Sequence, residues 1–175
     1  MTKIIAIGNC GNNILEFLKK QNYQIERDEN YKFISFTTSD DIQQLQLNED
    51  DTIFVVSGLG GSQGGKLTIE LTQTLLEKNL KVKNIVILPF NTETNAKKAI
   101  LELESLIALN QNVEVYPNND FMEDESNTML EIMGLADKVI FDRINRKDEN
   151  KDINTIQDVE SIAQTILRNY KEEVN

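Results

Sequence analysis

Short apolar runs alternate with amphipathic segments along most of the chain. The runs at Lys3–Gly8, Thr52–Ser57 and Asn84–Leu88 are mostly apolar and end at or just before glycine or proline, as expected of buried strands. Tyr31–Thr37 and Val113–Tyr116 are rich in β-branched and aromatic residues, which predicts two further strands.

The segments between these runs place apolar residues at helical spacing. They predict helices at Asn12–Lys20, Leu67–Lys78 and Ala96–Leu109, and two more at about 126–146 and 155–171. Strands that alternate with helices are typical of the α/β class, so we expect a doubly wound, mostly parallel sheet with helices on both faces. We expect one domain over residues 1–175, with a polar linker at about 147–153 before the C-terminal helix.

Charge limits the partners that the chain can take. The net charge is −11, from 29 acidic and 18 basic residues. Such a surface repels nucleic acid and anionic membranes, so neither is an expected partner. A bound nucleotide is still compatible, because backbone N–H groups can hold phosphates without a basic patch.

The residue types present also exclude several chemistries. Histidine is absent and Cys10 is the only cysteine, so we expect no Ser-His or Cys-His nucleophile, no disulfide and no metal ligand set. The apolar start is too short for a signal peptide, and no stretch approaches the ~20 apolar residues that span a bilayer. We therefore expect a cytoplasmic protein.

The first candidate site is Gly8–Asn13, between a predicted strand and a predicted helix. A tight turn there needs glycine, and the helix behind it offers free N–H groups to an anion. A plain strand-to-helix turn capped by Asn12 or Asn13 would explain the same residues. The spacing Gly-x-x-Gly does not match the dinucleotide fingerprint Gly-x-Gly-x-x-Gly.

The second candidate site is Ser57–Lys66, which holds five glycines in eight residues between Gly58 and Gly65. So many glycines cost conformational entropy, which favours a loop whose backbone approaches a phosphate over one that is merely flexible. It is not a Walker loop, because Leu67 stands where the magnesium-binding hydroxyl would be.

Five segments in order resemble the nucleotide-binding half of FtsZ and tubulin, over most of residues 3–140. Ile7–Ile14 resembles the tubulin opening Gly-Gln-Cys-Gly-Asn-Gln-Ile, and Ser57–Gly65 resembles the signature loop Gly-Gly-Gly-Thr-Gly-[Ser/Thr]-Gly. Leu88–Glu93 and Tyr116–Asp120 resemble the FtsZ segments Pro-Phe-x-x-Glu and Ile-Pro-Asn-Asp. Met129–Asp137 is similar to the start of the family's central helix.

The resemblance implies a site for GTP or GDP, with Mg²⁺ accompanying GTP. The residues that it implies for nucleotide binding are Gly8, Asn9, Cys10, Gly11, Asn12, Gly58, Gly60, Gly61, Ser62, Gln63, Gly64, Gly65, Pro89, Glu93, Lys97, Asn118 and Asp137. The glycine segments would cradle the phosphates, Glu93 would bind the ribose hydroxyls, and Asp137 would read the guanine edge. Lys97 replaces an arginine of FtsZ and keeps its charge without the bidentate fork.

Several of these residues also have ordinary structural interpretations. Glu93 could be an acid in the first turn of a helix, Asp137 a solvated helix position and Cys10 a small packed residue.

The sequence departs from the family in three places. Thr38–Asp51 is too short for the loop that closes on the γ-phosphate, and the family's second domain has no counterpart in these residues. The family's Asn-x-Asp-x-x-Asp pattern, which completes a neighbouring subunit's active site, is matched only by Ile153–Val159. That segment offers Asp158 as the one catalytic candidate, and a helix cap by Asn154 would explain it as well.

These features support a guanine-nucleotide-binding, FtsZ-like cytoskeletal protein of the cell-division type that acts by binding or assembly, with weak or no GTP hydrolysis. Its partner would be itself or a full-length FtsZ-like protein. One alternative is an active GTPase working in a homopolymer or with such a relative. Others are a Rossmann-type dinucleotide enzyme and a degenerate scaffold without a ligand.

Overall fold

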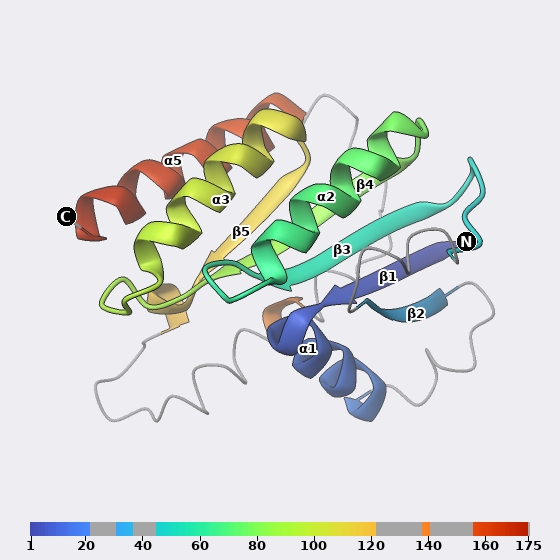
Figure 1. The fold of residues 1–175 in the computed structure, drawn as a ribbon, viewed down its shortest axis with the longest axis horizontal. Coiled ribbons are helices and arrows are strands. Elements are labelled where there is room, and N and C mark those ends of the chain that lie inside the picture. The colour runs from blue at the N-terminus through green and yellow to red at the C-terminus, as the bar shows by residue number, and fades with distance from the viewer. Residues whose placement is uncertain (22–30, 37–44, 122–137, 141–155, 175) are drawn as a thin grey trace.

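The computed structural model describes residues 1–21, 31–36, 45–121, 138–140 and 156–174. Within these ranges five parallel strands form one sheet in the order β2-β1-β3-β4-β5. The strands are β1 (Thr2–Ile7), β2 (Tyr31–Phe36), β3 (Thr52–Gly58), β4 (Lys81–Leu88) and β5 (Val113–Pro117). All carboxyl ends therefore meet at one edge of the sheet, as Figure 1 shows.

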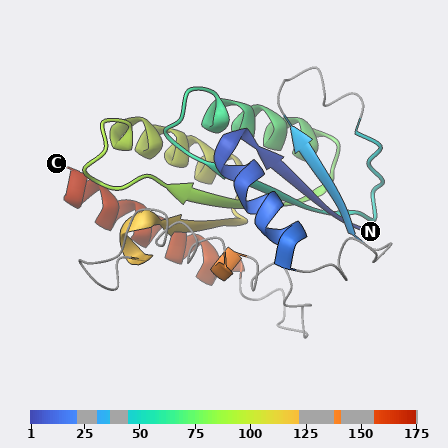
Figure 2. The ribbon, with the colours of Figure 1, turned by 90° about the horizontal axis from the view of Figure 1, so that it is seen from below.

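Helices cover both faces of this sheet. They are α1 (Gly8–Gln21), α2 (Gly64–Glu77), α3 (Ala96–Leu109) and α5 (Ile156–Val174), with a 3₁₀ turn η2 (Asn118–Phe121) after β5. Figure 2 separates α2 and α3 on one side from α1 on the other. The expected fold class, a doubly wound parallel α/β sheet, is confirmed.

Alternation along the strands explains the two faces. On β1 the side chain of Ile5 packs in the core cluster that contains Leu71 and Leu75 of α2. Its neighbour Ile4 packs in the cluster that contains Ile14 of α1 and Val56 of β3. Successive strand residues point to opposite faces, so continuously apolar strands are buried between two helical layers.

α5 lies along the β5 edge of the sheet, beside α3 (Figure 1). Ala163 and Tyr170 are its fully buried core residues among those described, and the Tyr170 hydroxyl donates to the carbonyl oxygen of Pro89 at 2.6 Å. Lys171 pairs with Glu104 of α3. None of the described helices is long and apolar enough to cross a lipid bilayer.

Two helices begin earlier than periodicity predicts. α1 starts at Gly8 rather than Asn12, and α2 starts at Gly64 rather than Leu67, because loop residues without an apolar pattern already form the first turn. β4 begins at Lys81 rather than Asn84. The expected polar linker lies outside the described residues, as does the helix predicted at about 126–146 apart from residues 138–140.

Candidate functional site

The strand order places a crevice between the ends of β1 and β3. From β1 the chain passes to β2 on one side of it and then to β3 on the other, so the sheet changes its winding direction there. In open α/β sheets ligands bind at such a switch point, outside the carboxyl ends of the strands. The segment after β1 and the glycine loop after β3 meet at this point. A Cβ atom placed on Gly8 would lie 3.7 Å from the Cα of Gly64.

A pocket of about 510 Å³ opens at this position. It brings together twelve of the residues predicted to bind nucleotide: Gly8, Asn9, Cys10, Asn12, Gly58, Gly61, Ser62, Gln63, Gly64, Pro89, Glu93 and Asn118. Gly11, Gly60, Gly65 and Lys97 do not line it, and Asp137 lies outside the described residues. Asp158 falls in the first turn of α5, and its side chain is likewise outside the description.

The pocket wall offers backbone N–H groups from two helix starts. α1 begins at Gly8 and α2 at Gly64, and both residues line the pocket. The residue before α2, Gln63, makes no side-chain capping hydrogen bond to it. First-turn N–H groups have no partner within their helix, and the helix dipole adds partial positive charge there. The geometry therefore suits an anion such as a phosphate.

Some glycines of the two segments serve packing instead. A Cβ on Gly11 would lie 2.4 Å from the carbonyl oxygen of Val56, and one on Gly65 would lie 1.9 Å from a carboxylate oxygen of Glu102. A Cβ on Gly61, by contrast, would meet nothing within 4 Å. Gly61 therefore keeps the pocket side of the loop open, while Gly11 and Gly65 allow close approach of neighbouring elements.

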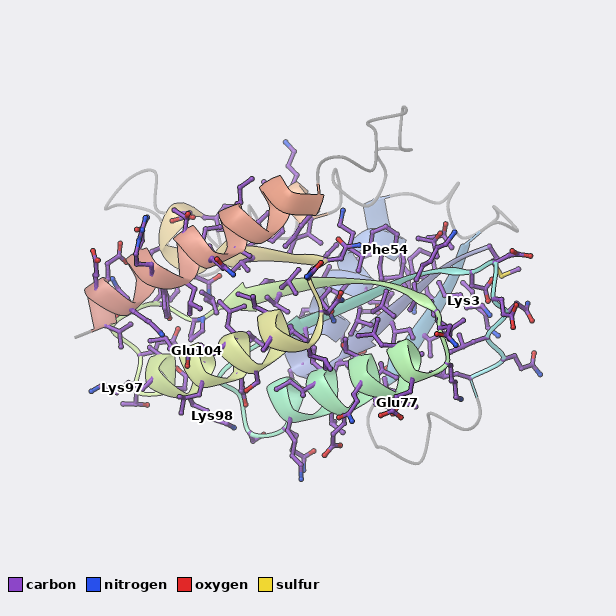
Figure 3. The ribbon with its side chains drawn as sticks, turned by 90° about the horizontal axis from the view of Figure 1, so that it is seen from above. Lys3, Phe54, Glu77, Lys97, Lys98 and Glu104 are labelled. Carbon is purple, nitrogen blue, oxygen red and sulfur yellow. The ribbon has the colours of Figure 1, made fainter. Side chains whose placement is uncertain are left out.

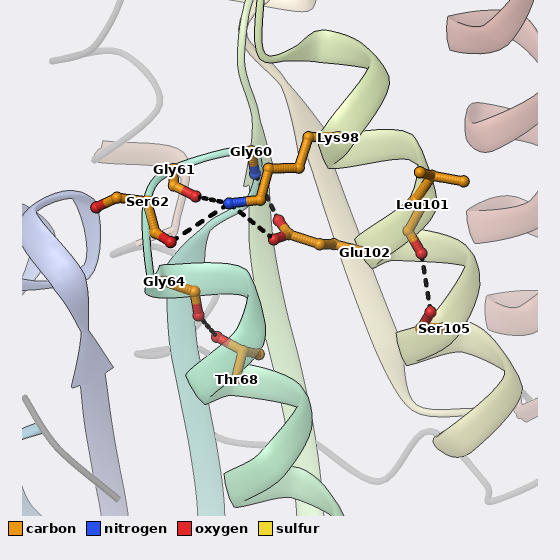
Figure 4. Close-up of polar contacts among 9 residues, drawn as sticks. All are labelled: Gly60, Gly61, Ser62, Gly64, Thr68, Lys98, Leu101, Glu102 and Ser105. Carbon is orange, nitrogen blue, oxygen red and sulfur yellow. Dashed lines mark hydrogen bonds and ion pairs between the residues drawn. The ribbon is translucent and has the colours of Figure 1, made fainter.

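Two residues of α3 hold the glycine loop, as Figure 4 shows. Glu102 Oε2 accepts the backbone N–H of Gly60 at 2.7 Å, and Glu102 is only 9% exposed. Lys98 Nζ hydrogen-bonds to the carbonyl oxygens of Gly61 and Ser62. Lys97 leaves α3 in a different direction from Lys98 (Figure 3). The lysine of α3 that contacts the glycine loop is thus Lys98, and the role of Lys97 in nucleotide binding stays a prediction.

The turn after β4 forms the opposite wall. Glu93 Oε1 accepts the backbone N–H of Phe90 at 2.8 Å, so this carboxylate closes the turn two residues ahead of the α3 N-cap, Asn95. It is therefore not a first-turn acid of α3. The N–H of Asn91 donates to Asn119 Oδ1 at 2.9 Å, which ties the turn to the segment after β5.

Asn12 lies inside α1, so neither it nor Asn13 caps that helix. Its Oδ1 accepts the hydroxyl of Ser35 at 2.7 Å, which joins α1 to β2. Cys10 lies on the pocket and also packs on Gly58, where an added Cβ would come within 2.8 Å of the Cys10 Cβ. Both interpretations of Cys10 are therefore compatible with its position.

One buried polar atom on the pocket wall has no partner within the described part of the chain. It is Oδ1 of Asn95, an acceptor at the N-cap of α3. A buried acceptor without a partner costs about 1–3 kcal/mol, so a ligand hydroxyl or N–H donor suits this position. Within the same described residues, no group of three or more side chains is placed to hold a metal ion.

Acidic side chains surround the outer part of the β4 turn. Burial raises the pKa of Tyr170 to about 12, and the negative charges of Glu93 and Glu173 add to the effect. The pKa of Asp120 is raised by burial and by Glu173. This side of the pocket therefore suits hydrogen-bond donors such as hydroxyl groups better than anions, for which the helix starts are suited.

Sequence reasoning missed the apolar lining and both loop-holding residues. The pocket is also lined by Ile7, Phe36, Leu59, Leu67, Ile87, Phe90 and Asn95. A signal for Glu102 does exist, because it is a charged residue on the same helical stripe as Leu103, Leu106 and Ala99, which are buried. A buried acid normally has a specific partner.

Comparison with known proteins identifies the fold. No family model and no curated protein matches the sequence. Among solved structures, FtsZ from M. jannaschii superposes with a TM-score of 0.67 at 17% identity, over 91% of this chain and 60% of that one. CetZ from Methanosaeta thermophila gives 0.65 at 16% identity, over 95% of this chain and 60% of that one. A GTPγS-bound CetZ2 protofilament from Haloferax volcanii gives 0.65 at 18% identity, over 82% and 56%.

The protein therefore has the FtsZ/tubulin-like fold, as the five sequence segments predict. It spans about three fifths of the length of these FtsZ and CetZ chains.

Proposed function

We propose that this protein binds a guanine nucleotide and acts by binding or assembly, with weak or no hydrolysis of GTP. The observation that carries the proposal is the meeting of two helix starts, those of α1 and α2, and an open glycine loop at the switch point of the sheet. Phosphate oxygens would accept hydrogen bonds from backbone N–H groups of the Gly8–Asn12 and Gly61–Gly64 segments, with Mg²⁺ accompanying GTP.

The ribose and base would lie along the β4 turn. Glu93 has one carboxylate oxygen committed to Phe90, and a carboxylate offers two oxygens, so a ribose hydroxyl can use the other. The acceptor of Asn95 is next to it in the chain and suits a second donor of the nucleoside. We retain Asp137 as the proposed guanine-reading residue, because a carboxylate accepts the paired N–H groups that guanine has and adenine lacks.

Assembly is supported by the known forms of the structural neighbours. One is a GTPγS-bound protofilament of CetZ2, and another, with a TM-score of 0.57, is a PhuZ201 filament. Tyr170 of α5 lies at the pocket end of the sheet, and Asp158 precedes it by twelve residues, or about 18 Å of helix. The proposed Asp158 would thus serve a neighbouring subunit's nucleotide rather than its own.

Thermal melting with GTP, GDP, ATP and NAD tests the proposal. A ligand that binds only the native state at 100 times its Kd stabilises the fold by about 2.7 kcal/mol. We expect GTP and GDP to raise the melting temperature and ATP and NAD to leave it nearly unchanged. Equal shifts with ATP would contradict guanine recognition, a shift with NAD alone would favour a dinucleotide enzyme, and no shift at all would favour a scaffold without a ligand.

A further inference from the structure

We propose that Lys98 and Glu102 are positioning residues that set the direction of the glycine loop's N–H groups, so that α3 prepares the loop for phosphate. This inference rests on the proposed nucleotide function and concerns residues that would not themselves contact the nucleotide. Neither residue lines the pocket.

The geometry of the peptide bond carries the first step. In a trans peptide, the carbonyl oxygen of one residue and the N–H of the next point in opposite directions. Lys98 Nζ holds the carbonyl oxygens of Gly61 and Ser62 toward α3. The N–H groups of Ser62 and Gln63 must therefore point away from α3, and both residues line the pocket. In Figure 4 the loop lies between α3 and the β1–α1 segment.

Glu102 supplies the second step. It accepts the Gly60 N–H at 2.7 Å, and its other oxygen lies 3.5 Å from Lys98 Nζ. Gly60 has a φ of +82°, so this peptide is held in a conformation that favours glycine. The carboxylate occupies the place that a side chain at Gly65 would need. An i,i+4 pair on one helix therefore fixes three consecutive residues of the loop.

The position of Lys98 separates this role from simple charge attraction. Its ammonium is hydrogen-bonded to loop carbonyls on the far side of the loop from the pocket, although its side chain is 47% exposed. An effect of bare charge on phosphate would be screened by salt, with a Debye length of ~10 Å at 0.1 M and ~3 Å at 1 M. An effect of Lys98 on the geometry of the loop would persist at 1 M salt.

The test compares Lys98→Met with Lys66→Met. Lys66 is a 77% exposed lysine in the first turn of α2, and its ammonium lies 3.6 Å from Glu70 Oε1 on the same helix. Its replacement therefore removes the same charge without releasing the loop. We expect Lys98→Met to weaken GDP binding about 10-fold or more at both 0.1 M and 1 M salt, and Lys66→Met to weaken it less than about 3-fold. Guanosine, which has no phosphate, should bind both variants like the native protein.

The outcomes separate this inference from the proposed function. If the native protein binds no guanine nucleotide, both fail. If it binds GDP but Lys98→Met does so equally well, or loses guanosine affinity by the same factor, only the positioning role fails. A loss that disappears at 1 M salt would also overturn it, in favour of charge attraction. Glu102→Gln keeps an acceptor for the Gly60 N–H, so it should bind GDP within about 3-fold of the native protein, whereas Glu102→Ala should not.

Discussion

At the scale of single residues, the glycine loop contains positions with very different surroundings. A Cβ atom at Gly61 would meet no atom within 4 Å and the φ of Gly61 is not in the left-handed region, so we expect the fold to tolerate valine there. It would, however, stand on the pocket wall, where the proposed phosphate would approach the backbone. We expect Gly61→Val to weaken GDP binding about 10-fold or more, measured by calorimetry, with an unchanged melting temperature.

Gly64→Val is the informative companion to that variant. Its Cβ would lie 2.9 Å from the carbonyl oxygen of Gly58, so it should lose stability as well as affinity. Undiminished GDP affinity in folded Gly61→Val protein would remove the phosphate role of the loop.

Gly65 is a packing position, and its prediction concerns stability. In Gly65→Ala the new methyl group would displace the Glu102 carboxylate, whose oxygen lies 1.9 Å from the Cβ position, and the bond to Gly60 would break. We expect a loss of about 1–3 kcal/mol of unfolding free energy, measured by denaturant titration. Gly61→Ala is the control, and it should leave the free energy of unfolding unchanged. If Gly65→Ala is as stable as the native protein, the hydrogen bond between Glu102 and the Gly60 N–H contributes little to the free energy of unfolding.

At the scale of elements, α5 is joined to the pocket through Tyr170, and this link depends on pH. The pKa of Tyr170 is raised to about 12 from an ordinary 10.0, so the folded state keeps the phenolic proton longer than the unfolded chain. Its contribution to stability is complete below pH 10 and is lost between pH 10 and 12. Tyr170→Phe should cost about 0.5–1.5 kcal/mol at pH 7 by losing the Pro89 bond.

Unfolding free energies measured at pH 9 and pH 11 check this linkage. The native protein should lose more stability over this interval than Tyr170→Phe does, because only the native protein carries the shifted phenol. Parallel losses in the two proteins would show that other groups govern the alkaline range.

Most elements could be predicted from the sequence, because strands and helices follow local apolar periodicity. Ala96–Leu109 has the predicted bounds, and the core strands differ by a few residues at their ends. The loop contacts could not be predicted in this way. Glu102 and Lys98 read as ordinary charged residues of an amphipathic helix, and their partners are backbone groups about 40 residues away. The distinction between Gly61 and Gly65 likewise depends on which element packs against each.

At the scale of the whole molecule, we expect these 175 residues alone to hydrolyse GTP very slowly or not at all. Attack on a γ-phosphate needs a positioned water and neutralised charge. The segment Thr38–Asp51 is short for a loop that closes on the γ-phosphate. Asp158 is the one acid proposed to act on the nucleotide of a neighbouring subunit. Loss of a single such element can cost ~10²–10³ in rate.

Phosphate release at high protein concentration, with Mg²⁺ and GTP, measures this activity. Adding a full-length FtsZ-like partner should raise it if that partner supplies the missing acids. Turnover by the chain alone that Asp158→Ala abolishes would show instead that α5 completes a working site between copies.

The hydrogen bonds between α3 and the glycine loop also have a consequence for the rate at which the proposed nucleotide would bind. The hydrogen bonds to Gly60, Gly61 and Ser62 come from Lys98 and Glu102, so they are made by groups of the protein itself. We therefore expect nucleotide to bind without a separate ordering step of the loop, with the binding-competent form as the major population. With a fluorescent GDP in a stopped-flow instrument, the observed rate should rise linearly with nucleotide concentration. In Lys98→Met the observed rate should level off at high nucleotide concentration. The plateau would equal the rate at which the released loop returns to the binding-competent conformation.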